Sequence, residues 1–197
     1  MTPVLLASTS ASRIALLKAA GVSFETRSPG VDEDAAKAAL LGEGASPRDV
    51  ADALAELKAL RGARGFSGLV IGADQTLELD GALVDKAATL DEARSRLIAM
   101  RGKAHKLHAG VVVARDGAPI WREVKTATLW MRPFSDAFLG DYLARHGEGI
   151  LSSVGCYRLE DEGVQLFTRI EGDYFTILGL PLLGLLDLLR LHGALAT

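Results

Sequence analysis

Residues 69–86 read LVIGADQTLELDGALVDK, and this stretch decides the fold class. Its first five residues, Leu69 to Ala73, form a continuous apolar run, which is typical of a strand covered on both faces of a sheet. The run ends at Asp74, so we expect a carboxylate where a buried strand meets a loop. Residues 77–84 predict a hairpin that turns at Asp80-Gly81.

Strand and helix signals alternate on both sides of this stretch. Val4 to Ala7 predicts a strand that runs into a serine-rich turn and then into a helix stopped by Gly21. Further helices are expected to begin near Asp32, Ser46, Thr89, Ser135 and Pro181, and further strands over 22–27, 107–114, 121–131 and 164–170. This alternation favours an α/β or mixed α+β fold, in a single domain over residues 1–197.

The composition excludes several functional classes. Apolar residues make up 49% and charged residues 24%, which is typical of a soluble globular protein. The net charge of -3 argues against nucleic acid or an anionic membrane as partner. Cys156 is the single cysteine, so no disulfide framework is possible and a cytoplasmic location is expected. No signal peptide is recognised, and the uncharged stretch 174–186 is too short to span a bilayer.

A hydroxyl-rich turn lies at the first expected helix start. Residues 5–13 read LLASTSASR, which places Ser8, Ser10 and Arg13 around the free N–H groups of a helix N-terminus. These groups together would bind an anion, most naturally a phosphate. Ordinary capping of the helix by Ser8 or Ser10 is the alternative.

An acidic cluster at positions 32–34 and the single acid Asp74 could each bind a metal. In the cluster, Asp32, Glu33 and Asp34 are either metal ligands or acids that a helix dipole stabilises. We expect the hairpin to bring Lys86 beside Asp74, where the acid would hold a divalent ion and the lysine would neutralise phosphate. A structural Asp–Lys ion pair is the alternative.

Other polar residues are less informative when each is taken alone. Lys58 is expected to be a solvated lysine on a helix surface. His105 and His108 are expected to have structural or surface roles, and Cys156 to be a buried thiol. The chain has no Walker motif, no GxGxxG, no HExxH and no GxSxG.

The order and spacing of these motifs resemble one family. The matching segments are Leu6–Arg13, Asp32-Glu33, Ala55–Ala59 around Lys58, Ile71–Gln75, Lys86, Gly102–His105, Glu171–Tyr174 and Gly179–Leu182. In that order they resemble the Maf (septum formation) nucleotide pyrophosphatases over nearly the whole chain. The resemblance implies a mixed twisted sheet flanked by helices, with two lobes around a cleft, similar to the inosine triphosphate pyrophosphatases.

The resemblance also implies an activity. Members hydrolyse a nucleoside triphosphate to the monophosphate and pyrophosphate, use Mg²⁺ or Mn²⁺, are commonly homodimers and are associated with septum formation. Carried over by position, Asp74, Lys86 and Glu33 would be catalytic, with Asp74 and Glu33 as metal ligands. The substrate-binding positions would be Ser8, Ser10, Ser12, Arg13, Lys58, Gln75 and Glu160.

Three positions depart from the usual pattern, since Ala11 replaces a proline, Ser12 an arginine and Gln75 a threonine. A further position bears on specificity. Glu160 stands where the subfamily that prefers dTTP and UTP has a glutamine. A carboxylate suits the N–H donors of a guanine edge and favours a cationic, methylated base. We therefore expect 7-methyl-GTP or a related nucleotide as substrate, with dTTP or UTP as the alternative. A nucleotide-sensing regulator of cell division without catalysis is a further alternative.

Overall fold

The computed structural model describes residues 1–196, so the final residue of the expected domain, 197, lies outside them. The strands are β1 (Val4–Leu6), β2 (Glu25–Thr26), β3 (Leu69–Leu79), β4 (Ala82–Val84), β5 (Ala104–Arg115), β6 (Ala118–Met131) and β7 (Phe167–Glu171). The α-helices are α1 (Ala11–Ala19), α2 (Glu33–Gly42), α3 (Pro47–Gly62), α4 (Leu90–Met100), α5 (Asp136–His146), α6 (Tyr174–Ile177) and α7 (Leu182–Leu191). Two 3-10 helices, η1 (Gly147–Ser152) and η2 (Glu162–Leu166), follow α5.

All seven strands belong to one mixed sheet. Its order is β2-β1-β3-β5-β6-β7, with β4 paired to β3. Strand β1 runs parallel to both of its neighbours, whereas the other pairings are antiparallel. The expectation of an α/β fold with a mixed sheet flanked by helices is confirmed.

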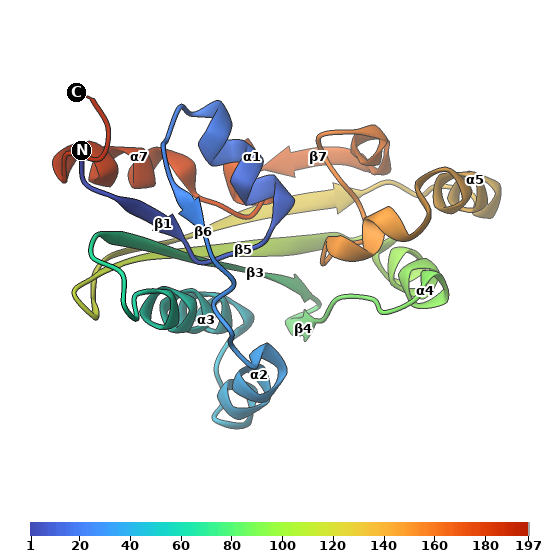
Figure 1. The fold of residues 1–197 in the computed structure, drawn as a ribbon. Helices are drawn as coiled ribbons and strands as arrows, with labels where there is room; N and C mark the ends of the chain where they lie inside the picture. The colour runs from blue at the N-terminus through green and yellow to red at the C-terminus, as the bar shows by residue number, and fades with distance from the viewer. Residues whose placement is uncertain (197) are drawn as a thin grey trace.

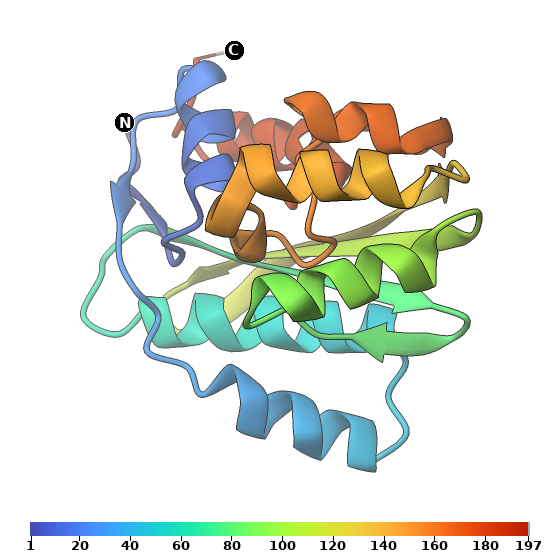
Figure 2. The same cartoon turned by 90° about the vertical axis from the view of Figure 1, so that its right-hand side faces the viewer.

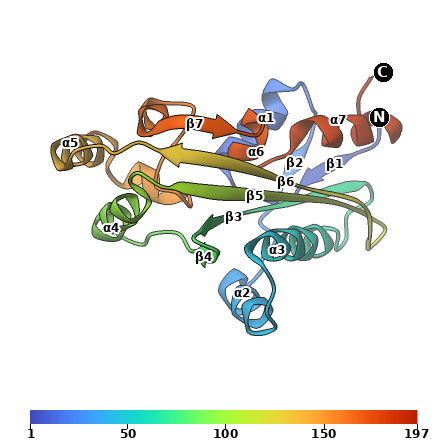
Figure 3. The same ribbon diagram turned by 180° about the vertical axis from the view of Figure 1, so that it is seen from behind.

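Helices cover both faces of the sheet. Helix α3 lies along one face with α2 outside it, and α1 and α7 lie on the other face (Figure 1). The view from behind shows the same layers, with α6 on the side of α7 (Figure 3). Figure 2 shows α2 as the outermost helix, beneath α3. Among residues 1–196, none of these helices has the length and apolar character that crossing a bilayer requires.

Two large hydrophobic clusters, called here the first and the second core, share the long strands, and two smaller clusters lie on the side of α3. The first includes Leu6, Ile71 and Leu185, and the second includes Leu77 and Tyr142. Strand β3 passes from one core to the other, because Ile71 lies in the first and Leu77 in the second. Gln75, between Ala73 and Leu77 on this face, therefore lies at the boundary between the two cores. Asp74 and Thr76 lie on the other face of the strand, where they contact α3.

Helix α3 lies unusually close to the sheet. A Cβ added at Gly72 would be 2.2 Å from the backbone oxygen of Ala55, and one added at Gly110 would be 2.7 Å from that of Ala51. Only glycine fits at these two positions without moving the helix. The close approach brings the buried face of α3 directly over the middle of β3.

Most expected element starts are confirmed, since Asp32, Ser46, Thr89 and Ser135 each cap a helix with their side chain. Three details differ. Asp74 lies inside β3 rather than at its end, because the expected strand and the first arm of the hairpin form one strand. The expected strand 22–27 is reduced to Glu25–Thr26, and the expected strand 164–170 begins only at Phe167, after a 3-10 helix.

Candidate active site

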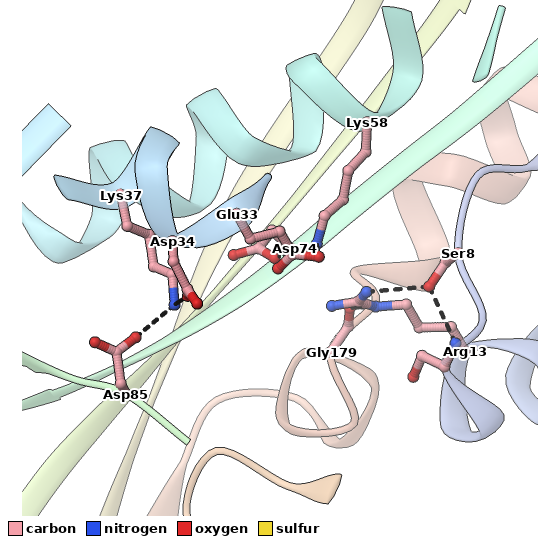
Figure 4. Close-up of polar contacts among 10 residues, drawn as sticks. Ser8, Arg13, Glu33, Asp34, Lys37, Lys58, Asp74, Asp85 and Gly179 are labelled. Carbon is pink, nitrogen blue, oxygen red and sulfur yellow. Dashed lines mark hydrogen bonds and ion pairs between the residues drawn. The ribbon is translucent and has the colours of Figure 1, made fainter. Parts of the chain in front are cut away.

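The centre of the candidate site is a lysine held between two carboxylates. The Nζ atom of Lys58, on α3, lies 2.7 Å from Oδ1 of Asp74, on β3, and 2.9 Å from Oε1 of Glu33, at the start of α2. The side chains of Lys58 and Asp74 are only 6% and 9% exposed, whereas that of Glu33 is 45% exposed. Figure 4 shows the three side chains converging from three different elements.

The expectation that Lys58 is solvated is wrong. Lys58 lies on the buried face of α3, which also carries Ala51, Leu54 and Ala55. Its positions three, four and seven residues after Ala55, Leu54 and Ala51 place it on that face, and this spacing was a signal that sequence reasoning could have used. The ion partner of Asp74 is therefore Lys58 rather than Lys86.

The environment of Asp74 adjusts its acidity. Burial raises the pKa of the Asp74 carboxyl above its ordinary value, and Glu33 adds to the shift, whereas Lys58 and Arg13 oppose it. A carboxylate with a raised pKa binds a proton more readily than an ordinary aspartate does. Asp74 is therefore suited to accept a proton from a water molecule.

The serine-rich turn is organised around Arg13. Oγ of Ser8 accepts hydrogen bonds from the backbone N–H of Ser10 at 3.2 Å and from Nη1 of Arg13 at 3.3 Å. The hydroxyls of Ser10 and Ser12 lie 3.0 Å apart. The side chain of Ser10, the N-cap residue of α1, makes no capping hydrogen bond. The turn thus presents hydroxyls and a guanidinium together, which is the arrangement expected for an anion site.

Arg13 is buried and faces the acidic pair. Its Nε donates a hydrogen bond of 2.8 Å to the carbonyl of Gly179, which fixes the guanidinium (Figure 4). Burial lowers the pKa of Arg13, and the nearby charges of Asp74 and Glu33 oppose that shift. The guanidinium remains protonated at neutral pH. A permanent positive charge therefore lies beside the two carboxylates.

Gln75 points to the opposite face of β3 from Asp74. Its Nε2 donates to the backbone carbonyls of Thr176 and Ile177, each at 2.9 Å. Gln75 and Arg13 therefore both hold the segment that leads from α6 to α7. The amide nitrogen of Gln75 binds the protein's own backbone in this structure.

Two expected site residues stand apart from the cluster. Lys86 is exposed, two residues after β4, and within residues 1–196 it forms no ion pair. Glu160 lies in a turn between η1 and η2 and accepts a long contact of 3.4 Å from Nε of Arg158. Neither residue touches Asp74 or Glu33. The structure thus brings Glu33, Lys58 and Asp74 into contact, with Ser8 and Arg13 alongside.

A comparison with known protein families adds to this geometry. The family described as "Maf-like protein" matches residues 3–192. The chain belongs to the Maf-like protein family. The match includes every residue of the cluster.

Relatives of this Maf-like chain are similar along their whole length. A protein of Caulobacter vibrioides named "Nucleoside triphosphate pyrophosphatase" is 68% identical, with 100% of this chain and 99% of the relative covered. One of Granulibacter bethesdensis with the same name is 52% identical over 98% of this chain and 99% of the relative. A protein of Rhizobium meliloti named "7-methyl-GTP pyrophosphatase" is 51% identical, covering 99% of each chain.

The protein supplies only some of the ligands that a metal ion would need at this Maf-like site. Among residues 1–196, no group of three or more His, Cys, Asp or Glu residues is arranged to hold a metal ion. Asp74 and Glu33 supply two carboxylates at a shared point. Mg²⁺ is commonly bound by one or two carboxylates together with substrate phosphates and water. The residues present therefore fit a divalent ion that binds together with a nucleotide.

The histidines and Cys156 lie outside this cluster. Both ring nitrogens of His108 are bonded at 2.9 Å, Nδ1 with Thr126 and Nε2 with Glu78. Nε2 of His105 lies 2.7 Å from the Tyr157 hydroxyl in the second core. Cys156 is a buried free thiol, as expected from the sequence. Both histidines are buried and so have structural surroundings.

Proposed function

We propose that this chain hydrolyses 7-methyl-GTP or a closely related modified nucleoside triphosphate to the monophosphate and pyrophosphate. The chain is a hydrolase of the nucleoside triphosphate pyrophosphatase type, which its membership of the Maf-like family and its relatives at 50% identity and above support. The observation that carries the site assignment is the contact of Asp74 and Glu33 with Lys58, beside the guanidinium of Arg13.

In this proposal Asp74 positions and deprotonates the attacking water. Attack on the α-phosphorus breaks its bond to the bridging oxygen, and pyrophosphate leaves with a high negative charge. Lys58, Arg13 and Lys86 would neutralise that charge, and the hydroxyls of Ser8 and Ser10 would donate hydrogen bonds to phosphate oxygens. Binding of the triphosphate would exchange the contact of Lys58 with Glu33 for one with phosphate. The raised pKa of Asp74 supports its role as proton acceptor.

A divalent metal belongs to the proposal. Nucleoside triphosphate pyrophosphatases generally use one, and we propose Mg²⁺ or Mn²⁺ held by Asp74 and Glu33 together with the phosphates. When bound, the ion supplies positive charge that polarises the phosphoryl group. Asp74 then either ligates the ion as a carboxylate or accepts the proton from water. The pH dependence of kcat in the Asp74→Glu variant separates these two roles.

Glu160 is proposed to select the base. Its carboxylate has only acceptor atoms and suits the N1–H and N2 amine of guanine. The positive charge of a 7-methylated base would strengthen that interaction. The Rhizobium meliloti relative named "7-methyl-GTP pyrophosphatase" supports this choice. Ser12 and Gln75 complete the proposed substrate contacts.

A nucleotide panel with pyrophosphate detection tests this proposal. We expect 7-methyl-GTP to have a kcat/KM at least tenfold above those of GTP, dTTP and UTP. Glu160→Gln should lower that preference by about tenfold, since a matched hydrogen bond to a charged group is worth about 1.5–3 kcal/mol. Asp161→Asn, a neighbouring acidic residue outside the proposed site, serves as the control. Best turnover of dTTP or UTP, unchanged by Glu160→Gln, would show that the alternative pyrimidine specificity is correct.

Two further proposals concern the whole protein. We propose that it acts as a homodimer in the cytoplasm, on a nucleotide rather than on nucleic acid. Its association with septum formation comes from the family resemblance alone. Light scattering on the purified chain gives the oligomeric state directly. Tight nucleotide binding without release of pyrophosphate would support the non-catalytic regulator instead.

A further inference from the structure

Helix α2 is attached loosely to the rest of the molecule. None of its side chains is buried. A groove of about 430 Å³, open to solvent, lies between α2 and α3, lined by Ala36 and Leu40 from α2 and by Leu57 and Leu60 from α3. Apolar packing therefore fixes the position of α2 only weakly, since the side chains that line the groove do not fill the space between the helices.

The connections at both ends of α2 turn at glycines in the left-handed backbone region. Gly30 precedes the helix with φ +61 and Gly44 follows it with φ +83, and a Cβ at either position would meet no atom within 4 Å. Such glycines act as turning points of the backbone and do not pack against other elements. The position of α2 thus depends on its polar contacts.

Those polar contacts are two lysine-centred ion pairs. Glu33 contacts Lys58 of α3, as described above. Four residues later, on the same side of α2, Nζ of Lys37 lies 2.5 Å from Oδ1 of Asp85 and 3.2 Å from Oδ1 of Asp34. Lys37 is 19% exposed, so its ammonium is partly shielded from water. Figure 4 shows this second pair beside the Glu33–Lys58–Asp74 cluster.

The partner of Lys37 is adjacent to a proposed site residue. Asp85 directly precedes Lys86, in the segment after β4. Strand β4 is held on β3 by the pairing of Leu77 with Val84 and of Leu79 with Ala82. One ammonium group thus links the helix that carries Glu33 to the segment that carries Lys86.

We propose that Lys37 is a positioning residue for the pyrophosphatase reaction, which holds Glu33 and Lys86 at fixed places relative to Asp74. Lys37 itself touches neither substrate nor metal in this proposal. It acts by clamping α2 to the Asp85 segment. The inference rests on the proposed function, because it uses the site roles of Glu33 and Lys86.

Substitution of Lys37 or of Asp85, the two residues of the proposed clamp, tests the proposal in the full-length protein. Lys37→Ala and Asp85→Ala are each expected to raise the KM for 7-methyl-GTP by about fivefold, because a partly exposed ion pair shifts an equilibrium by roughly that factor. The melting temperature should change by less than about 2 °C. The exchange Lys37→Asp with Asp85→Lys, which restores an opposite-charge pair, should return KM to within about twofold of wild type.

Lys103→Ala is the matched control. Lys103 pairs with Asp80 at 2.9 Å, and both side chains are more than half exposed. This pair lies at the tip of the β3–β4 hairpin, away from α2, so the variant should keep the wild-type KM. A KM shift in Lys103→Ala equal to that in Lys37→Ala would mean that loss of any surface charge produces the effect, and it would overturn the clamp.

A double-mutant cycle separates positioning from a general structural effect. Binding of the non-hydrolysable α,β-methylene analogue of GTP with Mg²⁺ is measured by calorimetry. In a Glu33→Gln, Lys86→Ala background, Lys37→Ala should not weaken binding further, since the groups it positions are gone. A fully additive loss would overturn the proposal. If the Glu33→Gln, Lys86→Ala variant binds the analogue and turns over substrate like wild type, the site assignment is wrong. The proposed role of the Lys37–Asp85 contact is then wrong as well. An impaired background with a normal Lys37→Ala variant overturns the clamp alone.

Discussion

The buried polar groups of the candidate site and those of the second core differ in charge. Between α3 and β3, Lys58 and Asp74 are buried as an ion pair, and the charge of the buried Arg13 guanidinium acts on Asp74 without contacting it. In the second core, the buried polar groups are neutral, as in the pair formed by His105 and Tyr157. The same sheet therefore supports a charged region and an uncharged one.

The protonation behaviour of the second core explains the difference. Burial raises the pKa values of Tyr142, Tyr157 and Cys156 and lowers the pKa of His105 to about 4, so all four are uncharged at neutral pH. Uncharged groups need only a hydrogen bond to be buried, whereas charges need a partner of opposite sign. The buried Lys58–Asp74 pair thus lies where the proposed chemistry uses charge, whereas buried ion pairs in general seldom add to stability.

The largest effect is expected from Asp74→Asn, which removes the proposed proton acceptor from the charged region. Loss of a general base lowers kcat by about 10²–10⁴-fold. The amide retains the shape of the side chain, so circular dichroism should show the wild-type fold. Turnover of 7-methyl-GTP by stopped assay gives the measurement. A loss smaller than tenfold would assign proton transfer to another group.

Lys58→Met tests whether the charged region depends on pairing for its stability. The substitution leaves Asp74 buried without its nearest cation, and removal of one partner of a buried pair costs about 3 kcal/mol or more. Urea denaturation at pH 7 measures the free energy of unfolding. Lys103→Met, at a side chain 51% exposed, should change it by no more than about 0.5 kcal/mol. Equal losses in the two variants would contradict the contrast between buried and surface pairs.

Lowering the pH is expected to lower the free energy of unfolding through His105 in the second core. The pKa of His105 falls from the ordinary 6.5 to about 4 in the folded state. Between these values the unfolded chain binds the extra proton, so this contribution is complete above pH 6.5 and is lost as the pH falls toward 4. The slope is about 1.4 kcal/mol per pH unit at most. His105→Gln should show a flatter decline of the urea midpoint over this range. Parallel declines would show that other groups dominate.

Much of the fold could be predicted because its signals are local. The apolar run before Asp74 and the capping residues Asp32, Ser46 and Ser135 each depend on neighbouring residues in the chain. The error at Asp74 has a tertiary cause. A polar residue ends an apolar run in the sequence, but pairing with β5 continues the strand to Glu78 and pairing with β4 extends it to Leu79.

The site could be predicted only as separate candidates. The local surroundings of Glu33, Asp74 and Arg13 indicate site residues, and the structure places the three near one another. Lys58 taken alone is predicted to be solvated, because a lysine in a helix usually is, and only its place on the buried face of α3 distinguishes it. The Lys37–Asp85 contact joins residues 48 apart and has no local signal. Contacts between distant segments depend on the packing of α2, which the sequence pattern does not specify.

The close approach of α3 to Gly72 and Gly110 has a consequence for how this enzyme can change. Backbone atoms, which cannot be repacked, set the gap between helix and sheet at those two positions. A single methyl group at either would lift α3 and withdraw the Lys58 ammonium from its carboxylates. Alanine there should therefore silence the enzyme while the residues of its reaction centre remain untouched. The absence of side chains at Gly72 and Gly110 therefore determines whether the Lys58 ammonium can contact its carboxylates.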